Sequence, residues 1–184
     1  AERHIPIARV WNPTVVFQDA FEYYKEVAKE QFGWEAGPEQ CIGSRYIHVA
    51  ETTEQAIEEC RAAVMYVRRL STFSRPVQVP APVPGLQTDR SYDYRKRSKG
   101  AEMPGPGTPF EKLRESGYIV CGDPDYVTDW LANDMETAGY GHFMGMFRVG
   151  SNSHENVIKS KNLFAEHVMP KLKHINEAAP AATV

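Results

Sequence analysis

The sequence predicts an α/β fold in which short strands and helices alternate along the chain. In the last third, residues 118–121 and 142–149 have the composition of buried strands. Residues 126–139 and 156–173 carry apolar side chains at helical spacing. This alternation is typical of a parallel sheet with crossover helices, as in an α/β barrel. The chain has 184 residues, whereas a closed (β/α)₈ barrel usually needs about 250, so we expect part of a barrel.

The first 70 residues repeat the alternation. Residues 5–11 form a short, mostly apolar run, which is typical of a parallel strand buried on both faces. A helical pattern follows over residues 14–32 and ends at Gly33. Residues 45–50 predict the second strand, and the helix after it runs to about residue 70. Together with the last third, the sequence predicts about four strand–helix units.

The starts of two helices carry recognisable capping residues. Thr52 is followed by Gln55 three residues later, which is a capping-box pattern. Asp123 is a suitable N-cap, and Pro124 occupies the first helical position, where its missing N–H costs nothing.

A long insertion separates the second and third units. Seven of the 13 prolines lie between residues 75 and 109. A structureless connection of this length inside a domain is usually functional or disordered. We therefore expect one partial-barrel domain over residues 1–175, with a lid-like insertion at 75–112 and a frayed tail at 176–184.

Composition limits the possible partners and locations. The net charge of −3 does not favour binding to nucleic acid or to an anionic membrane surface. No apolar run approaches the 18 or so residues of a membrane span, and no signal peptide is visible. We expect a cytoplasmic protein.

The three cysteines, Cys41, Cys60 and Cys121, are widely spaced. They form no CxxC pair and no cluster with histidine, so a metal site is not expected. Reduced thiols are the favoured interpretation.

The chain resembles the C-terminal half of bacterial luciferase and of the wider luciferase-like, flavin-dependent monooxygenases. The resemblance rests on the order and spacing of four segments: residues 5–11, residues 23–28 with 32–33, residues 92–94, and the last two units through residues 122–127, 137–139 and 163–170. None of these segments is a catalytic signature by itself.

The resemblance implies a TIM barrel that oxidises a small organic substrate with O₂ and reduced FMN. The FMN would be reduced by a separate reductase or by NAD(P)H, and some members use a deazaflavin instead. It also implies that this chain lacks most of the flavin site, which an N-terminal half or a partner chain would supply. The alternative is a non-catalytic half-barrel or subunit that pairs with itself or with a partner, as a homo- or hetero-oligomer, because open sheet edges and apolar faces favour pairing.

Three residues are candidate cofactor ligands. Trp11 ends a strand on the catalytic face of a barrel, where it would pack against the flavin ring or simply cover the barrel mouth. Arg148 and Gly150 end the last strand on the same face. Arg148 would bind a flavin phosphate or an anionic substrate, or else form an ion pair with a nearby carboxylate.

The insertion supplies candidate lid residues, which are Tyr92, Asp93, Tyr94 and Arg97. A loop that closes over a flavin would exclude water from the reacting oxygen, whereas the alternative is a solvated loop. His48 lies mid-strand with no carboxylate close in sequence, so a buried structural histidine is favoured over a catalytic one. No residue is assigned a catalytic role.

Overall fold

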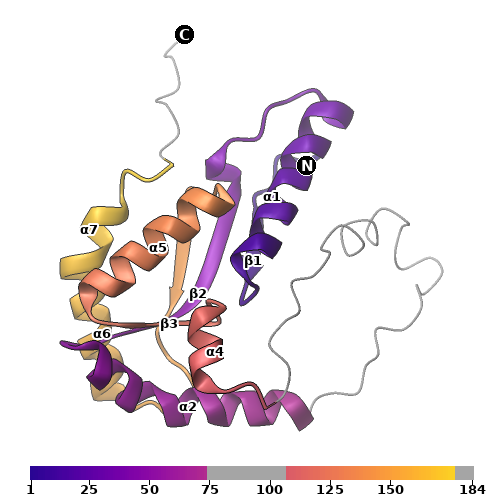
Figure 1. The fold of residues 1–184 in the computed structure, drawn as a ribbon. Coiled ribbons are helices and arrows are strands. Elements are labelled where there is room, and N and C mark those ends of the chain that lie inside the picture. The colour runs from indigo at the N-terminus through magenta and orange to yellow at the C-terminus, as the bar shows by residue number, and fades with distance from the viewer. Residues whose placement is uncertain (74–106, 177–184) are drawn as a thin grey trace.

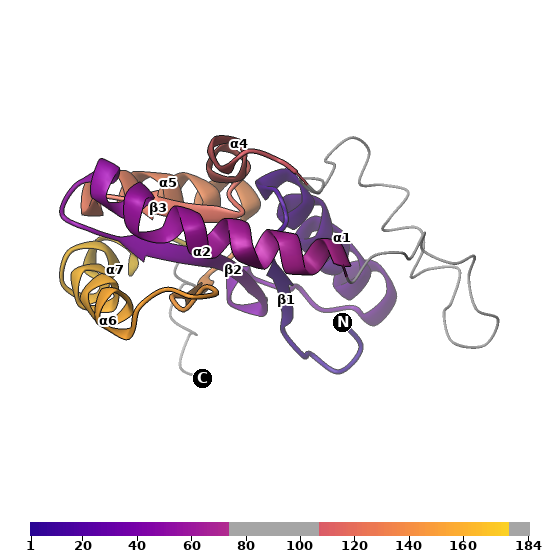
Figure 2. The same ribbon diagram turned by 90° about the horizontal axis from the view of Figure 1, so that it is seen from below.

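The computed structural model describes residues 1–73 and 107–176 of the chain (Figure 1). Strands and helices alternate through both parts, and α2 is the long helix that runs across the view in Figure 2. The elements are β1 (Ile7–Val10), α1 (Thr14–Phe32), η1 (Pro38–Gln40), β2 (Cys41–Val49), α2 (Thr53–Phe73), α4 (Phe110–Glu115), β3 (Ile119–Gly122), α5 (Pro124–Ala138), β4 (His142–Met146), α6 (His154–Leu163), η2 (Phe164–Val168) and α7 (Met169–Leu172).

The sheet is parallel and is built around β2. Residues 42–44 of β2 pair with both β1 and β4, so these two strands lie on opposite edges of β2. β3 pairs with the second half of β2, from Tyr46 to Val49. The predicted α/β class with a parallel sheet is therefore confirmed. In a barrel each strand lies beside the next one, whereas here β4 pairs with β2.

Helices cover both faces of the sheet. Because side chains alternate along a strand, β2 contributes residues to a separate apolar cluster on each face. Ile47 and Val49 belong to a first cluster, which includes residues of α1, α5, η2 and α7. Tyr46 and Ala50 belong to a second cluster, which includes residues of α2 and α4. A barrel keeps its helices on the outer face only. The half-barrel therefore stays a prediction, although the four strand–helix units are present.

The predicted helix ends are largely confirmed. Gly33 ends α1 in the left-handed conformation, with a φ of 70°. The Asp123 side chain accepts a hydrogen bond from the Tyr126 amide at 2.9 Å and caps α5. Thr52 accepts one from the Gln55 amide at 3.2 Å. The Gln55 side chain, however, donates to Glu59 instead of returning to the cap, so only half of the capping box forms.

Other boundaries differ from the sequence expectation. β2 starts at Cys41 instead of residue 45, because its first residues pair with strands on both sides. The predicted last helix is divided, since the five-residue π-helix η2 separates α6 from α7. Pro170 is the second residue after η2; it lacks an N–H and its ring disfavours a regular α-helix before it.

The expectation that the first strand is buried on both faces is wrong. Ala8 and Val10 are exposed, and Ile7 and Arg9 are only half-buried. In the described residues β1 pairs only with β2, so its second edge carries no strand. The two parts described contain no helix that is both long enough and apolar enough to cross a membrane.

Candidate functional site

The carboxyl ends of the strands are the place to look for a site in a parallel α/β fold. Val10 of β1 pairs with Ser44, and Met146 of β4 pairs with Tyr46. The ends of β1 and β4 therefore lie at nearly the same height along β2. Gly122, the end of β3, pairs with Val49, which is five residues beyond Ser44, or roughly 17 Å at 3.3 Å per residue. The candidate region thus has a lower level, at the ends of β1 and β4, and an upper level, at the ends of β2 and β3.

Trp11 lies at the lower level in a strained backbone conformation. Its φ is 57°, a left-handed value that is uncommon for a bulky residue. Its amide donates to the carbonyl of Ser44 at 3.4 Å, and its ring stacks on Tyr46 with centroids 5.2 Å apart and planes 9° apart. The indole Nε1 is buried and has no hydrogen-bond partner among the described residues. Strain of this kind is often found at functional sites.

An aromatic row extends from Trp11 into the second cluster. The ring of Tyr46 lies 5.5 Å from that of Tyr118, and the Arg68 guanidinium lies over Tyr118 at 5.0 Å. Burial is the larger cause that raises the pKa of Tyr46 to about 12, and Tyr118 is the smaller one. Tyr46 is therefore a neutral phenol at physiological pH. The row holds one face of Trp11 in a fixed orientation.

Arg148 and Gly150 follow β4 at the same level. Arg148 is exposed, and no ion pair of Arg148 is found in the described part of the chain. Gly150 has a φ of 52°, and a Cβ placed there would lie 2.7 Å from the Ala63 carbonyl oxygen of α2. Close packing against α2 therefore explains this glycine. Among the described residues no hydrogen bond or cation–π contact is found between Arg148 and Trp11, although Val149 and Trp11 both belong to the second cluster.

The upper level holds a polar hollow of about 550 Å³ between the ends of β2 and β3 and the C-terminal helical segment. Its carboxylates already have partners. Glu51 pairs with Lys159 at 3.1 Å, and Asp125 pairs with Lys171 at 2.8 Å. Asp123 accepts a hydrogen bond from the Thr53 hydroxyl at 2.6 Å in addition to capping α5, and these bonds lower its pKa. This agrees with the prediction that Asp123 is a helix-start residue.

His48 has a carboxylate partner that the sequence analysis missed. Its Nε2 lies 2.8 Å from Oε2 of Glu59 on α2, and the imidazole is fully buried. The Gln55 amide donates to the other oxygen of Glu59 at 2.7 Å. Glu59 immediately precedes Cys60, which is buried against the sheet. Its place beside the buried face of α2 was the signal that could have indicated a carboxylate near the sheet. The favoured interpretation of His48 as a buried structural histidine agrees with this arrangement.

A buried ion pair was also missed. Arg45 of β2 forms two hydrogen bonds to Asp134 of α5, Nε to Oδ2 at 3.0 Å and Nη2 to Oδ1 at 2.7 Å. The Tyr140 hydroxyl donates to Oδ2 at 2.7 Å, and the Thr14 hydroxyl donates to Oδ1 at 2.5 Å. Burial first, and then the charge of Asp134, raise the pKa of Tyr140 well above its ordinary value. The guanidinium also lies 4.0 Å from the Phe17 ring. This network fastens α1 and α5 to the sheet.

The three cysteines are free and buried, as the favoured interpretation expects. Burial raises the pKa of the Cys41 thiol to about 11. A hydrogen bond between Cys60 and Cys121 raises the pKa of Cys60. In the described residues no group of three or more histidine, cysteine or acidic side chains is placed to hold a metal ion. The predicted lid residues, Tyr92, Asp93, Tyr94 and Arg97, lie outside the described residues.

Comparison with solved structures identifies the fold. No family model and no curated protein matches the chain. Solved structures, two of them named as monooxygenases, do match it over nearly its whole length, so the predicted resemblance is confirmed for the fold alone.

Three of these structures are informative. The monooxygenase RslO1 from Streptomyces bottropensis matches 92% of the chain with a TM-score of 0.65 and 18% identity. The oxygenating constituent of 3,6-diketocamphane monooxygenase from Pseudomonas putida, a Type II Baeyer–Villiger monooxygenase in complex with FMN, matches 92% with a TM-score of 0.58 and 18% identity. Apo-MsnO8 matches 91% with a TM-score of 0.54 and 19% identity. The chain spans only 42%, 43% and 46% of these three proteins, respectively.

Proposed function

We propose that the chain is part of a luciferase-like flavin-dependent monooxygenase that oxidises a small organic substrate with O₂ and reduced FMN. The likeness of fold to monooxygenases, one of them in complex with FMN, carries this proposal. When bound, reduced flavin would supply the electrons that activate O₂. A deazaflavin would be the substitute within the same class.

The described residues fit part of a flavin site. Trp11 offers an aromatic surface held in place by Tyr46, and its indole N–H has no partner among the described residues. Such a donor is suited to a polar atom at the edge of a flavin ring. Arg148 is an exposed cation at the end of β4, suited to a phosphate or an anionic substrate. Gly150 would let the loop after β4 stay close to α2.

The remainder of the site would come from another segment or chain. Trp11 offers an aromatic surface and Arg148 a cation, and these two residues are only part of what a flavin needs. We therefore propose that this chain lacks most of the flavin site and becomes competent when an N-terminal half of a barrel, or a partner chain, completes it. In that assembly the predicted lid residues Tyr92, Asp93, Tyr94 and Arg97 would cover the substrate and exclude water.

Titration with FMN and with riboflavin, followed by flavin fluorescence, tests the proposal. We expect FMN to bind the isolated chain only weakly, because one exposed arginine contributes little by itself. We expect Arg148→Gln to remove any preference for FMN over riboflavin, whereas Lys29→Gln, at an exposed lysine on α1, leaves it unchanged. Tight FMN binding by the isolated chain that Trp11→Leu and Arg148→Gln do not weaken would contradict the proposed site.

A second candidate function is a non-catalytic half-barrel or subunit that pairs with itself or with a partner. The exposed edge strand β1 favours it. The two candidates differ in one observation, since a non-catalytic subunit would bind no flavin even when its partner is present.

A further inference from the structure

Two of the three free cysteines form a pair between α2 and the sheet. Cys60 lies on α2 and Cys121 on β3, both belong to the second cluster, and neither side chain is exposed. A hydrogen bond joins the two thiols. The two residues are about 60 positions apart in the sequence, so only the fold brings them together.

The register of the strands and the packing of α2 fix this contact. Cys121 is the partner of His48 in the pairing of β3 with β2. His48 bonds to Glu59, the residue before Cys60, with Nε2 and Oε2 2.8 Å apart. Successive residues of α2 are thus fastened over neighbouring strands, Glu59 over β2 and Cys60 over β3. A disulfide places its sulfur atoms about 2.05 Å apart, so thiols that already touch need only a small movement to form one.

Two cations lie beside the pair and favour a thiolate on Cys121. Arg114 of α4 donates from Nε and Nη2 to the Cys121 carbonyl at 3.2 and 3.0 Å. Arg61 directly follows Cys60 and pairs with Glu111 at 2.6 Å. The hydrogen bond with Cys60 is the largest cause that lowers the pKa of Cys121, and the charges of Arg114 and Arg61 act in the same direction against burial. A thiolate is the reactive form of a cysteine.

The other thiol of the pair keeps its proton. The hydrogen bond with Cys121 first, then burial, and then the charges of Cys121 and Glu59 raise the pKa of Cys60, and the charge of Arg114 only partly opposes them. The two cysteines therefore differ in their chemistry. Cys121 is the nucleophile, and Cys60 is the thiol that attacks second.

We propose that Cys60 and Cys121 are a modification site at which a hydroperoxide, such as hydrogen peroxide, forms a disulfide between α2 and β3. The Cys121 thiolate attacks one oxygen of the peroxide, the O–O bond breaks, and the leaving hydroxide takes up a proton to become water. The Cys60 sulfur then attacks the sulfur of the Cys121 sulfenic acid, and the second oxygen leaves as water with the Cys60 proton. The two thiols lose two electrons and two protons, and one peroxide becomes two waters.

The disulfide would hold α2 against the face of the sheet that it covers. The second cluster on this face also contains Trp11 and Tyr46. A thiol reductant would release the link by thiol–disulfide exchange. The proposal does not depend on flavin binding, which a separate titration measures.

Intact-mass measurement and peptide mapping of the folded protein, after treatment with millimolar hydrogen peroxide, test the site. We expect a loss of about 2 Da, which corresponds to two hydrogen atoms, and a linked peptide pair that carries Cys60 and Cys121. A thiol reductant should restore the mass. Mapping separates this change from methionine oxidation, which adds oxygen. Cys60→Ser and Cys121→Ser should each abolish the linked pair.

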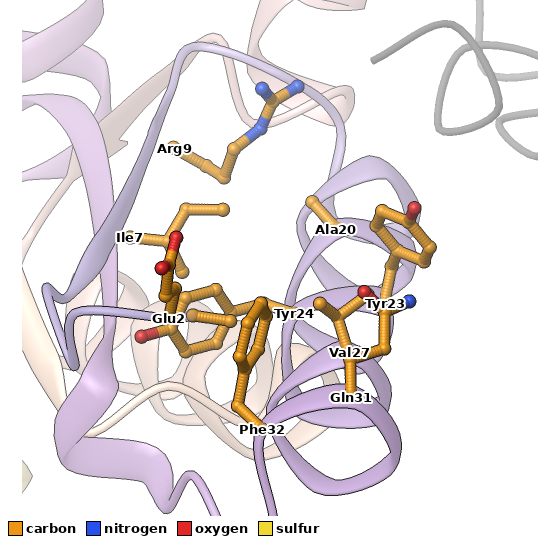
Figure 3. Close-up of a pocket in the computed structure, with 10 residues that line it drawn as sticks. Glu2, Ile7, Arg9, Ala20, Tyr23, Tyr24, Val27, Gln31 and Phe32 are labelled. Atoms are coloured by element: carbon orange, nitrogen blue, oxygen red, sulfur yellow. The ribbon is translucent and has the colours of Figure 1, made fainter. Parts of the chain in front are cut away.

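Cys41 is the matched control, because it is a buried free thiol in the first cluster, on the opposite face of the sheet. It lies near Tyr24, which lines the apolar groove of about 490 Å³ between β1 and α1 (Figure 3). Cys41→Ser should leave the Cys60–Cys121 disulfide unchanged. Folded protein in which Cys60 and Cys121 both stay reduced would overturn the proposal. So would a disulfide that contains Cys41.

The role of the cation has its own test. Arg114→Gln should slow formation of the disulfide at pH 7 about threefold or more, and should move the rise of the rate with pH to higher pH, because the thiolate of Cys121 loses a neighbouring charge. Lys112→Gln is the control on the same helix, since Lys112 is exposed and pairs with Glu115, and it should leave the rate unchanged. Thermal unfolding confirms that each variant is folded. Equal rates and equal pH profiles for Arg114→Gln and the wild type would refute this role.

Discussion

β1 and β3 are both four-residue strands that pair with β2, but their surroundings differ completely. Every residue of β3 is buried, whereas no residue of β1 is. β3 has α5 on one face and α2 on the other, through Val120 in the first cluster and Ile119 and Cys121 in the second. β1 has a helix on one face and nothing described on its second edge. The interior of the sheet is thus packed on both faces within this chain, whereas the β1 side is not.

The largest effect should come from the buried ion pair at the centre of the sheet. Asp134→Ala leaves the Arg45 guanidinium buried without its counter-charge, and we expect a loss of about 3–5 kcal/mol in the free energy of unfolding. Chemical denaturation measures it. Glu35→Ala, in the exposed Lys29–Glu35 pair near the β1 side, is the control and should cost less than about 1 kcal/mol. Equal losses for the two variants would show that the Arg45–Asp134 pair is no more important to stability than an exposed pair.

Truncation of an isoleucine separates the two strands directly. Ile119→Ala in β3 removes a side chain with no exposure and should cost about 2–5 kcal/mol. Ile5→Ala, just before β1, removes one that is 63% exposed and should change stability by no more than about 0.5 kcal/mol in dilute protein. If Ile5→Ala proved as costly as Ile119→Ala in monomeric protein, the β1 side would already be packed.

Tyr140 makes the stability of the interior depend on pH. Its pKa is raised in the folded chain by burial and by Asp134, so the folded state keeps this proton when the unfolded state has lost it. The contribution of Tyr140 to stability is therefore unchanged below pH 10, and is lost as the pH rises above 10, by up to about 1.4 kcal/mol per pH unit.

Tyr140→Phe should make that decline above pH 10 shallower, although Tyr46, whose pKa is about 12, contributes a decline of the same sign. Denaturation at several pH values between 8 and 11 measures the slope. Identical slopes for the wild type and the variant would show that Tyr140 ionises as freely in the folded chain as in the unfolded one.

The smallest expected effect compares two glycines of similar backbone conformation. Gly33, at the end of α1 on the β1 side, has φ of 70° and open space around it, whereas Gly150 has φ of 52° and lies against the Ala63 carbonyl. Both alanine substitutions carry the left-handed penalty of about 1–2 kcal/mol. We expect Gly150→Ala to cost about 1 kcal/mol more, because the added methyl also pushes the loop away from α2. Thermal unfolding of the two variants gives the difference, and a larger loss for Gly33→Ala would contradict this packing.

Local signals in the sequence predicted the elements well, and long-range contacts explain what they missed. Gly33, Thr52 and Asp123 end or start helices as their chemistry requires, because a cap depends on three or four neighbouring residues. The β1 burial was predicted wrongly because an apolar run does not reveal whether a second strand lies beside it.

The candidate site was predictable only in part for the same reason. Trp11 was placed at a strand end, but its strained φ and its stacking on Tyr46 depend on a pairing partner more than 30 residues away in sequence. The partners of Arg45 and His48 lie on helices that follow later in the chain, at Asp134 and Glu59. No local pattern joins Arg45 to Asp134, which lies 89 residues later in the sequence. The roles of Trp11, Arg148 and Gly150 towards a flavin stay predictions.

Hydrogen exchange, followed at residues 7–10 and 119–122 as the protein is concentrated, tests the central comparison most directly. We expect the amides of β3 to be protected at every concentration, because they lie in the interior of the sheet. We expect β1 to exchange quickly in dilute protein, because no strand of the described residues pairs with its second edge. β1 amides as protected as those of β3 in dilute, monomeric protein would contradict the account, since the edge strand would then already be covered.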